Sequence, residues 1–192
     1  MDQAKVDAAL VKVLERSPIR NFLDIGTGSG HVLRLVASEV ETGIGVDYSR
    51  DMLLVARSNL YHLGLRNCQV RQADMMRLPF REGSFDAITL CMVLHYAEDP
   101  AGAVAEAARV LEPGGRLIVA DFAPHQVHEL REQHAHRWLG FSTEHIRDYF
   151  ESAGLAPERA VILPGKPITV CLWPARRAAN DGLKRRDSRR VG

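Results

Sequence analysis

The alternation of short apolar runs with helical patterns, from about residue 20 to residue 121, most constrains how this chain can fold. The run at 85–93, FDAITLCMV, is almost continuously apolar, which is typical of a strand buried on both faces of a parallel sheet. Further strand-length runs occur at 20–26, 43–47, 68–74 and 116–121, and helical patterns follow most of them. Strands that alternate with helices predict a Rossmann-like, doubly wound α/β fold with right-handed crossovers.

Capping residues mark where several helices should begin. Ser49, Asp99 and Ser142 each directly precede a helical pattern, and their side chains suit the N-cap position. Phe141 is expected to pack on Ile146 as a hydrophobic staple at the last of these helices. The segment EPGG at 112–115 is expected to be a turn that leads into the next strand.

The two ends of the chain complete the expected domain. A helix is predicted over 2–16, and two strand-like runs joined by a Pro-Gly turn predict an antiparallel hairpin over 156–175. We find no internal repeat or linker and expect one domain over residues 1–174. Residues 175–192 hold seven Lys or Arg against two Asp and almost no large apolar side chain, so we expect a disordered basic tail.

Charge and cysteine content argue against several classes of protein. The net charge is +1 and the tail contributes +5, so the rest of the chain sums to −4 and is a poor general binder of nucleic acid. No run approaches the ~18 apolar residues of a membrane helix, and no signal-peptide pattern is present. Cys68, Cys91 and Cys171 form no CxxC pair and favour a cytoplasmic protein. The oligomeric state stays open, a homodimer included.

A glycine-rich loop lies between the first predicted strand and the following helix. Gly26, Gly28 and Gly30 allow positive φ and let a ligand approach the backbone, although a turn without a ligand is an alternative. A dinucleotide fingerprint needs a small residue where this chain has His31, and no Gly-Lys-Ser/Thr of a P-loop follows. The loop therefore disfavours a pyrophosphate ligand.

Acidic residues end or adjoin three of the predicted strands. Asp47 follows Gly26 by 21 residues, where a carboxylate can bind both hydroxyls of a ribose; its alternative role is to cap the next helix. Asp74 could accept a hydrogen bond from an adenine amine or serve as a turn residue. Asp24 could orient an ammonium group, directly or through water. Together these acids suit a ligand with an amine, a ribose and an adenine but no phosphate.

Five segments in order, LDIGTGSG, GVDYS, QADMMRLPF, FDAITLCMVLHY and RVLEPGGRLIVAD, resemble the motifs of class I S-adenosylmethionine-dependent methyltransferases. The resemblance is to methyltransferase type 11, the small-molecule branch that includes the ubiquinone/menaquinone biosynthesis methyltransferases, and it covers about residues 20–121. It implies a seven-stranded sheet, mostly parallel with one antiparallel C-terminal strand. It also implies a methyltransferase domain over 1–174 that binds S-adenosylmethionine and releases S-adenosylhomocysteine.

The resemblance also implies which residues contact the cofactor. The implied set is Asp24, Gly26, Thr27, Gly28, Gly30, Asp47, Tyr48, Met52, Asp74, Met75 and Cys91. The glycine loop and Cys91 would face the methionine part, and Asp47 would hold the ribose. Met52 and Met75 would lie against the adenine, although core packing is the alternative for a methionine.

Candidate residues on the acceptor side follow the fourth predicted strand. Methyl transfer needs proximity and orientation of the acceptor, with a base only if the acceptor must lose a proton. His95 could act as that base and Tyr96 lies beside it; the alternative is that His95 only shapes the pocket. These two residues are the predicted catalytic candidates.

Five of the eight histidines fall within residues 125–145. His134 and His136 differ by about 200° around a helix, so they cannot share one face as metal ligands. His125 and His128 have no nearby cysteine to complete a set, and we expect no metal. The segment is expected to be either a polar lid or an exposed helix, and His125, His134 and Arg137 are the predicted acceptor-pocket residues.

A narrower resemblance covers about residues 4–177. DFAPH, REQHAHRWLGFS, EHIRDYFESAGL and VCLWPARR are similar to bacterial methyltransferase domains fused behind an ArsR-type winged-helix domain. Only one short helix precedes the methyltransferase part here, so DNA binding is not carried over. The three cysteines form no evident thiolate cluster, which disfavours arsenic methylation.

The predicted function is methyl transfer from S-adenosylmethionine to an oxygen, nitrogen or carbon nucleophile of a small molecule. The alternative from another class is a sensor that binds S-adenosylmethionine or S-adenosylhomocysteine without turnover. An NAD-dependent oxidoreductase is disfavoured because His31 breaks the dinucleotide fingerprint.

Overall fold

The computed structural model describes residues 2–14 and 18–179, with no description of the Gln133 side chain. The described strands are β1 (Ile19–Ile25), β2 (Val40–Asp47), β3 (Cys68–Gln72), β4 (Phe85–Cys91), β5 (Leu111–Phe122), β6 (Leu155–Pro157), β7 (Val161–Leu163) and β8 (Val170–Arg177). The described helices are α1 (Gln3–Leu14), α2 (His31–Val36), α3 (Arg50–His62), α4 (Pro100–Val110), α5 (Glu129–His134) and α6 (Thr143–Ser152), with a 3₁₀ turn η1 (Leu94–Tyr96).

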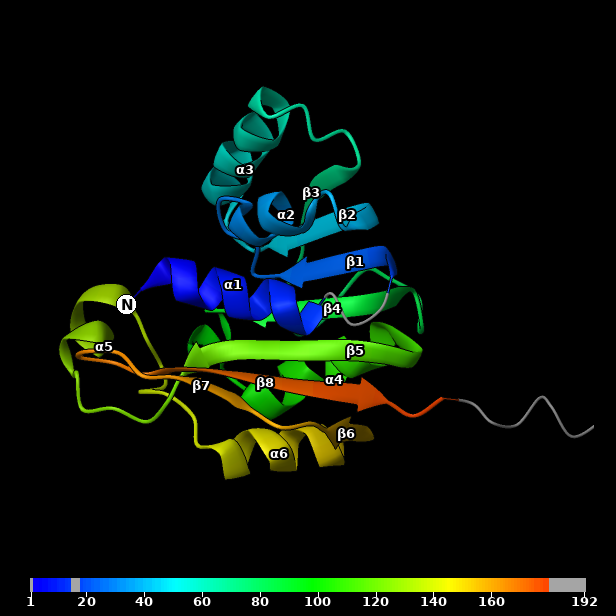
Figure 1. The fold of residues 1–192 in the computed structure, drawn as a ribbon. Helices are drawn as coiled ribbons and strands as arrows, with labels where there is room; N and C mark the ends of the chain where they lie inside the picture. The colour runs from blue at the N-terminus through cyan, green and yellow to red at the C-terminus, as the bar shows by residue number, and fades with distance from the viewer. Residues whose placement is uncertain (1, 15–17, 180–192) are drawn as a thin grey trace, which may run out of the picture.

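One mixed sheet forms the centre of the molecule, in the order β3-β2-β1-β4-β5-β8-β6 (Figure 1). Helices α1, α2 and α3 cover one face, and α4 and α6 cover the other. Side chains of successive residues in β1 point to opposite faces of the sheet. Phe22 packs with α1, α2 and α3, while Leu23 and Ile25 pack with α4 and α6. The predicted doubly wound, mostly parallel α/β fold is confirmed.

The predicted count of seven strands is corrected to eight. β6 pairs with the end of β8, whereas β7 pairs with its beginning. Between them Glu158 N donates to Pro174 O at 2.8 Å, so the two short strands occupy a single edge position. The sheet therefore has seven positions, and β8 is its antiparallel strand, as predicted.

Two predicted boundaries differ from the structure. The segment 112–115, expected to be a turn, belongs to β5, and its pairing with β4 shifts register between Phe85 and Ala87. The tail was expected to begin at residue 175, but β8 continues to Arg177 because Ala175 pairs with Leu117 and is fully buried. Residues 180–192 of the predicted tail lie outside the described residues.

The expected helix starts are present. Ser49 Oγ accepts from Met52 N at 3.3 Å, Asp99 Oδ1 accepts from Gly102 N at 3.0 Å, and Ser142 Oγ accepts from His145 N at 3.1 Å. No helix in the described residues is long and apolar enough to cross a membrane.

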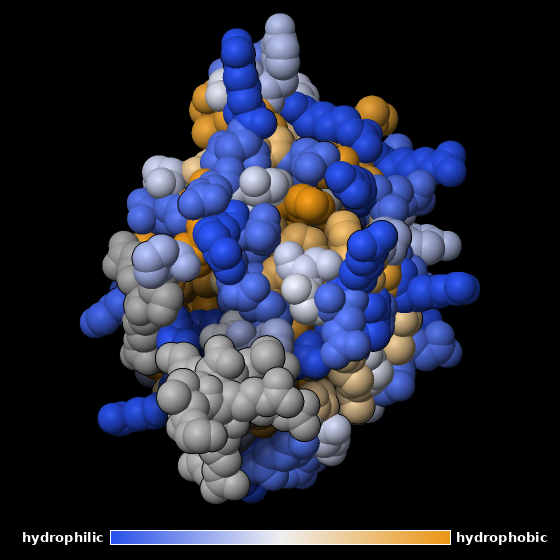
Figure 2. Space-filling model, turned by 90° about the vertical axis from the view of Figure 1, so that its right-hand side faces the viewer, coloured by the Kyte–Doolittle hydropathy of each residue, from blue (hydrophilic) through white to orange (hydrophobic). Residues whose placement is uncertain are grey.

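The two ends of the parallel strands differ in shape. Figure 2 looks onto the side where the parallel strands begin, and hydrophilic side chains cover most of its described surface. A hollow of about 160 Å³ lies near the start of β1, between Ile19 and Asp86. The opposite side, where the parallel strands end, holds a cavity of about 630 Å³.

Candidate functional site

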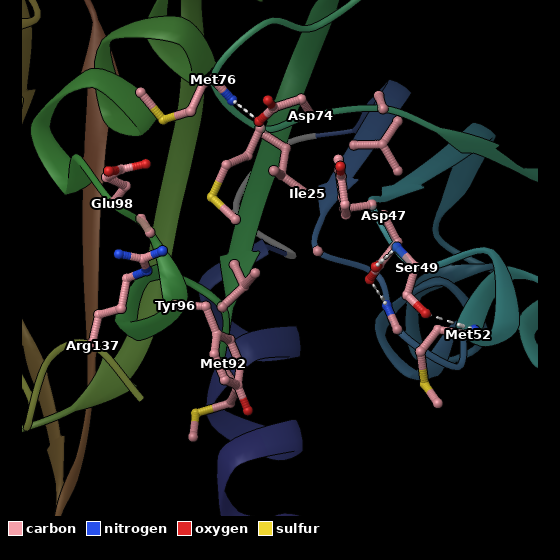
Figure 3. Close-up of a pocket in the computed structure, with 18 residues that line it drawn as sticks. Ile25, Asp47, Ser49, Met52, Asp74, Met76, Met92, Tyr96, Glu98 and Arg137 are labelled. Carbon is pink, nitrogen blue, oxygen red and sulfur yellow. Dashed lines mark hydrogen bonds between the residues drawn. The ribbon is translucent and has the colours of Figure 1, made fainter. Parts of the chain in front are cut away.

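The cavity of about 630 Å³ lies where β1, β2 and β4 end, at the point where the strand order reverses between β1 and β4. Ligands of open α/β sheets bind at this kind of switch point. Its wall includes Gly26, Gly28, Asp47, Tyr48, Ser49, Met52, Asp74, Met75, Met92, Tyr96, Glu98 and Arg137 (Figure 3). A second cavity of about 670 Å³ lies between α3 and β3, away from the glycine loop.

The glycine loop forms one wall of the first cavity. Gly26 has φ +74°, and a Cβ there would lie 2.2 Å from Val93 Cγ2, so only glycine fits. Gly28 has φ +50° and open space beside it, which leaves its backbone accessible to a ligand. Gly30 and Thr27 are not on the wall; Gly30 forms the start of α2, and Thr27 is buried.

Asp47 links the glycine loop to the start of α3. Its Oδ2 accepts from Gly28 N and its Oδ1 from Ser49 N, both at 2.8 Å (Figure 3). The N-cap of α3 is Ser49, so the alternative role of Asp47 as that cap is not observed. Each carboxylate oxygen can accept a second hydrogen bond, which leaves Asp47 able to bind two hydroxyls.

Asp74 occupies a turn and also lines the cavity. Its Oδ1 accepts from Met76 N at 2.9 Å, and its carbonyl accepts from Arg77 N at 3.0 Å. The turn role is therefore present, and the exposed carboxylate remains free to accept from a ligand. Tyr48 and Met52 are 76% and 44% exposed, so core packing does not explain them.

Asp24 lies behind the cavity wall, fully buried at the end of β1. Its Oδ1 accepts from Thr89 Oγ1 at 2.7 Å, while Oδ2 has no hydrogen-bond partner among the described residues. Burial raises the pKa of Asp24 to about 6, against the opposing effect of the Thr89 hydroxyl. Burial and nearby carboxylates also raise the pKa of Cys91, which keeps this thiol protonated; Cys91 is not on the wall.

The structure separates the two predicted catalytic residues. Tyr96 lines the cavity and is 43% exposed, whereas His95 is 2% exposed and lies behind the wall. The His95 ring points instead to Asp121, with Nδ1 2.8 Å from Oδ1. Burial and the Asp121 charge raise the pKa of Tyr96, so its phenol keeps its proton near neutral pH.

The histidine-rich segment contributes one residue to the wall, Arg137. Helix α5 ends at His134, and the positive φ of Ala135 turns the chain so that His134 stays exposed and His136 is buried. His125 and His134, which are predicted to lie in the acceptor pocket, are not on the cavity wall. No group of three potential metal ligands occurs in the described part of the chain.

Sequence reasoning missed Asp121, although its position gave a signal. It comes near the end of a strand, in RLIVAD, as Asp24 does in β1. Its side chain is fully buried and accepts three N–H hydrogen bonds, two from His95 and one from Phe122.

The model of the family described as "Methyltransferase domain" matches residues 23–119, just over half of the chain. The chain belongs to the methyltransferase domain family. The uncharacterized methyltransferase YcgJ of Bacillus subtilis is 37% identical over 116 residues, 60% of this chain and 46% of YcgJ. The demethylmenaquinone methyltransferase of Thermus thermophilus is 40% identical over 114 residues, 58% of this chain and 50% of that protein. The matched region thus spans about half the length of these methyltransferases.

Solved structures agree with the fold of this methyltransferase domain. The crystal structure of Bacillus subtilis YcgJ has a TM-score of 0.80 at 22% identity, covering 91% of this chain and 99% of YcgJ. Geranyl diphosphate C-methyltransferase from Streptomyces coelicolor A3(2) has a TM-score of 0.79 at 16% identity, covering 91% of this chain and 77% of that protein. The [4+2]-cyclase SpnF has a TM-score of 0.79 at 19% identity, covering 92% of this chain and 82% of SpnF. The likenesses show a shared fold, and the narrower resemblance to ArsR-linked domains stays a prediction.

Proposed function

We propose that the chain is an S-adenosylmethionine-dependent methyltransferase that methylates an oxygen, nitrogen or carbon atom of a small molecule. The observation that carries the proposal is the distribution of charge in the cavity. Gly26, Gly28 and Asp47 form a wall without a cation, and Arg137 is the sole Lys or Arg among the described lining residues. In Figure 3 Arg137 lies across the cavity from Asp47. This arrangement suits a ribose and an amino acid better than a pyrophosphate.

The residues present fit this cofactor. Asp47 would hold the ribose, and Asp74 the adenine amine between Tyr48, Met52 and Met75. The open space at Gly28 would admit the methionine part, and the unpaired Oδ2 of Asp24 would attract its ammonium group through water. When bound, the cofactor supplies a methyl group already activated by a sulfonium. The chain's own task is then to orient the acceptor.

The acceptor would bind on the side of Tyr96 and Arg137. Because the pKa of Tyr96 is raised, its phenol would donate a hydrogen bond to the acceptor rather than remove a proton. Arg137 would pair with an anionic or carbonyl group. A small molecule is also what the name of the relative demethylmenaquinone methyltransferase implies for that protein.

A sensor that binds the cofactor without turnover is the second candidate. The buried position of His95 favours it, because the predicted base does not reach the cavity wall. SpnF, a [4+2]-cyclase with the same fold, is named for a reaction other than methyl transfer. Release of S-adenosylhomocysteine in the presence of metabolite extracts would favour the enzyme; binding without any release would favour the sensor.

Calorimetry with S-adenosylmethionine, S-adenosylhomocysteine and NAD tests the cofactor. We expect the first two to bind and NAD not to bind. Binding of NAD alone would overturn the proposal.

Asp47→Ala is expected to weaken S-adenosylhomocysteine binding by about 1.5–3 kcal/mol, because charge-assisted hydrogen bonds to the ribose are lost. The dissociation constant, measured by calorimetry, should rise by roughly 10- to 150-fold. Asp51→Ala is the matched control, because Asp51 is an exposed acid in the first turn of α3 that does not line the cavity. Equal dissociation constants for Asp47→Ala and Asp51→Ala would show that Asp47 does not contact the cofactor.

A further inference from the structure

A buried carboxylate lies behind the acceptor side of the cavity. Asp121 Oδ1 accepts from His95 Nδ1 and from Phe122 N, both at 2.8 Å, and Oδ2 accepts from His95 N at 3.2 Å. Asp121 is fully buried and His95 is 2% exposed. Burial of a charged group is costly unless it is paired and hydrogen-bonded, and these three donors meet that need. The pair therefore has a fixed geometry.

The pairing also fixes the chemistry and orientation of the imidazole. Because Nδ1 faces a carboxylate, it carries the proton. The ring lies 4.2 Å from the Tyr96 ring and stacks at 4.0 Å on the His136 ring, measured between centroids. Burial and the neighbouring His95 lower the pKa of His136 to about 4, so the stacked partner stays neutral near neutral pH.

The backbone of His95 connects the pair to a third segment. Its carbonyl accepts from Arg137 N at 2.9 Å and from Trp138 N at 3.2 Å. Trp138 Nε1 in turn donates to Ala97 O at 2.9 Å. The end of β5, the turn η1 and residues 136–138 thus meet at His95.

Two of the residues tied to His95, Tyr96 and Arg137, line the cavity. Figure 3 shows both on the side opposite Asp47 and Ser49. Asp47 makes its hydrogen bonds to the glycine loop and to the start of α3, and none to the His95 group. The buried pair is thus joined to one half of the cavity and not to the other.

We propose that Asp121 is a positioning residue for the methyl acceptor: it holds the His95 ring, and His95 holds the Tyr96 phenol and the Arg137 backbone in the acceptor half of the cavity. The role toward a methyl acceptor rests on the proposed function. The coupling of Asp121 to Tyr96 does not depend on it. A preorganised acceptor half favours the in-line geometry that methyl transfer needs.

The first experiment needs no acceptor. The chain has four tyrosines, and ¹³C labelling of their rings gives a spectrum in which Tyr96→Phe identifies the Tyr96 signal. In Asp121→Asn the Tyr96 signal should move. The pKa of Tyr96, which burial and the Asp121 charge both raise, should fall because that charge is removed. Should Asp121→Asn fail to fold, His95→Gln tests the same link and should also move the Tyr96 signal.

Asp86→Asn is the matched control. The Asp86 side chain is only 11% exposed and lies at the opposite end of the sheet. Its carboxylate accepts hydrogen bonds from Arg20 N at 2.9 Å and Asn21 N at 3.0 Å. It should leave the Tyr96 signal and its pKa unchanged. A Tyr96 signal that moves equally in both variants, or in neither, would overturn the coupling.

The second experiment tests the acceptor role. In Asp121→Asn, kcat/KM for an acceptor found by S-adenosylhomocysteine release should fall by about 10- to 100-fold, with an unchanged dissociation constant for S-adenosylhomocysteine. An equal weakening of S-adenosylhomocysteine binding would overturn the restriction to the acceptor half. If wild-type chain binds neither cofactor form, the proposed function fails, and the Tyr96 spectra still decide whether Asp121 is coupled to Tyr96.

Discussion

Gly26→Ala is expected to lower the free energy of unfolding by about 2–5 kcal/mol. The backbone at Gly26 has φ +74°, which costs a residue with a Cβ about 1–2 kcal/mol. The new Cβ would also lie 2.2 Å from Val93 Cγ2 and 2.5 Å from its Cβ, and such overpacking costs about 1–3 kcal/mol. Urea unfolding followed by circular dichroism measures the change.

Gly28→Ala separates the clash from the backbone cost. Gly28 has φ +50° and no atom within 4 Å of the added Cβ, so its destabilisation should stay at about 1–2 kcal/mol. The added methyl would instead occupy space in the cavity and weaken cofactor binding. Val93→Gly should partly rescue Gly26→Ala, because it removes the Val93 side-chain atoms that lie 2.2–2.9 Å from the added Cβ. Equal destabilisation by the two glycine variants would contradict the clash.

Asp24→Asn is expected to gain stability, relative to wild type, as the pH rises. The pKa of Asp24 is about 6 in the folded chain and 3.8 in its ordinary state, so the folded form binds its proton more tightly. The wild-type chain therefore loses stability as the pH rises through about 6, whereas asparagine does not titrate. The difference in unfolding free energy between the variant and wild type should grow by about 2 kcal/mol between pH 4 and pH 7.5.

The gain in stability should come with weaker cofactor binding, because the variant would lack the charge that we propose attracts the ammonium group of the cofactor. Urea unfolding at the two pH values and calorimetry at pH 7.5 give both quantities. Thr89→Val is the control: it removes the hydrogen bond at 2.7 Å that favours the charged form, so it should raise the pKa of Asp24 further. A stability difference that does not depend on pH would contradict the raised pKa.

Local patterns were sufficient for most of the fold. The buried strand β4, the caps at Ser49 and Ser142, and the hairpin of β7 and β8 follow from neighbouring residues, and the structure confirms them. The predicted seven strands match the seven positions of the sheet, and the eighth strand arises because β6 and β7 share the edge position beside β8.

Local sequence could likewise place some residues of the candidate site but not others. Gly26, Gly28 and Asp47 could be placed because each directly ends a strand or follows one, and the carboxyl ends of parallel strands meet at one edge. His134 could not be placed, because the turn at Ala135 leaves His134 exposed and His136 buried. The roles of the predicted acceptor-pocket histidines, and those of the implied cofactor contacts, stay predictions.

The sequence by itself determined the doubly wound fold, the glycine loop and the acids beside it, because these depend on residues close together in the chain. Only the tertiary structure decided that His95 is buried and Tyr96 exposed, and that Asp121 holds His95 although 26 residues separate them. The physical reason is that burial and pairing depend on segments that meet after folding: β5, η1 and residues 136–138 together exclude water from the His95–Asp121 pair.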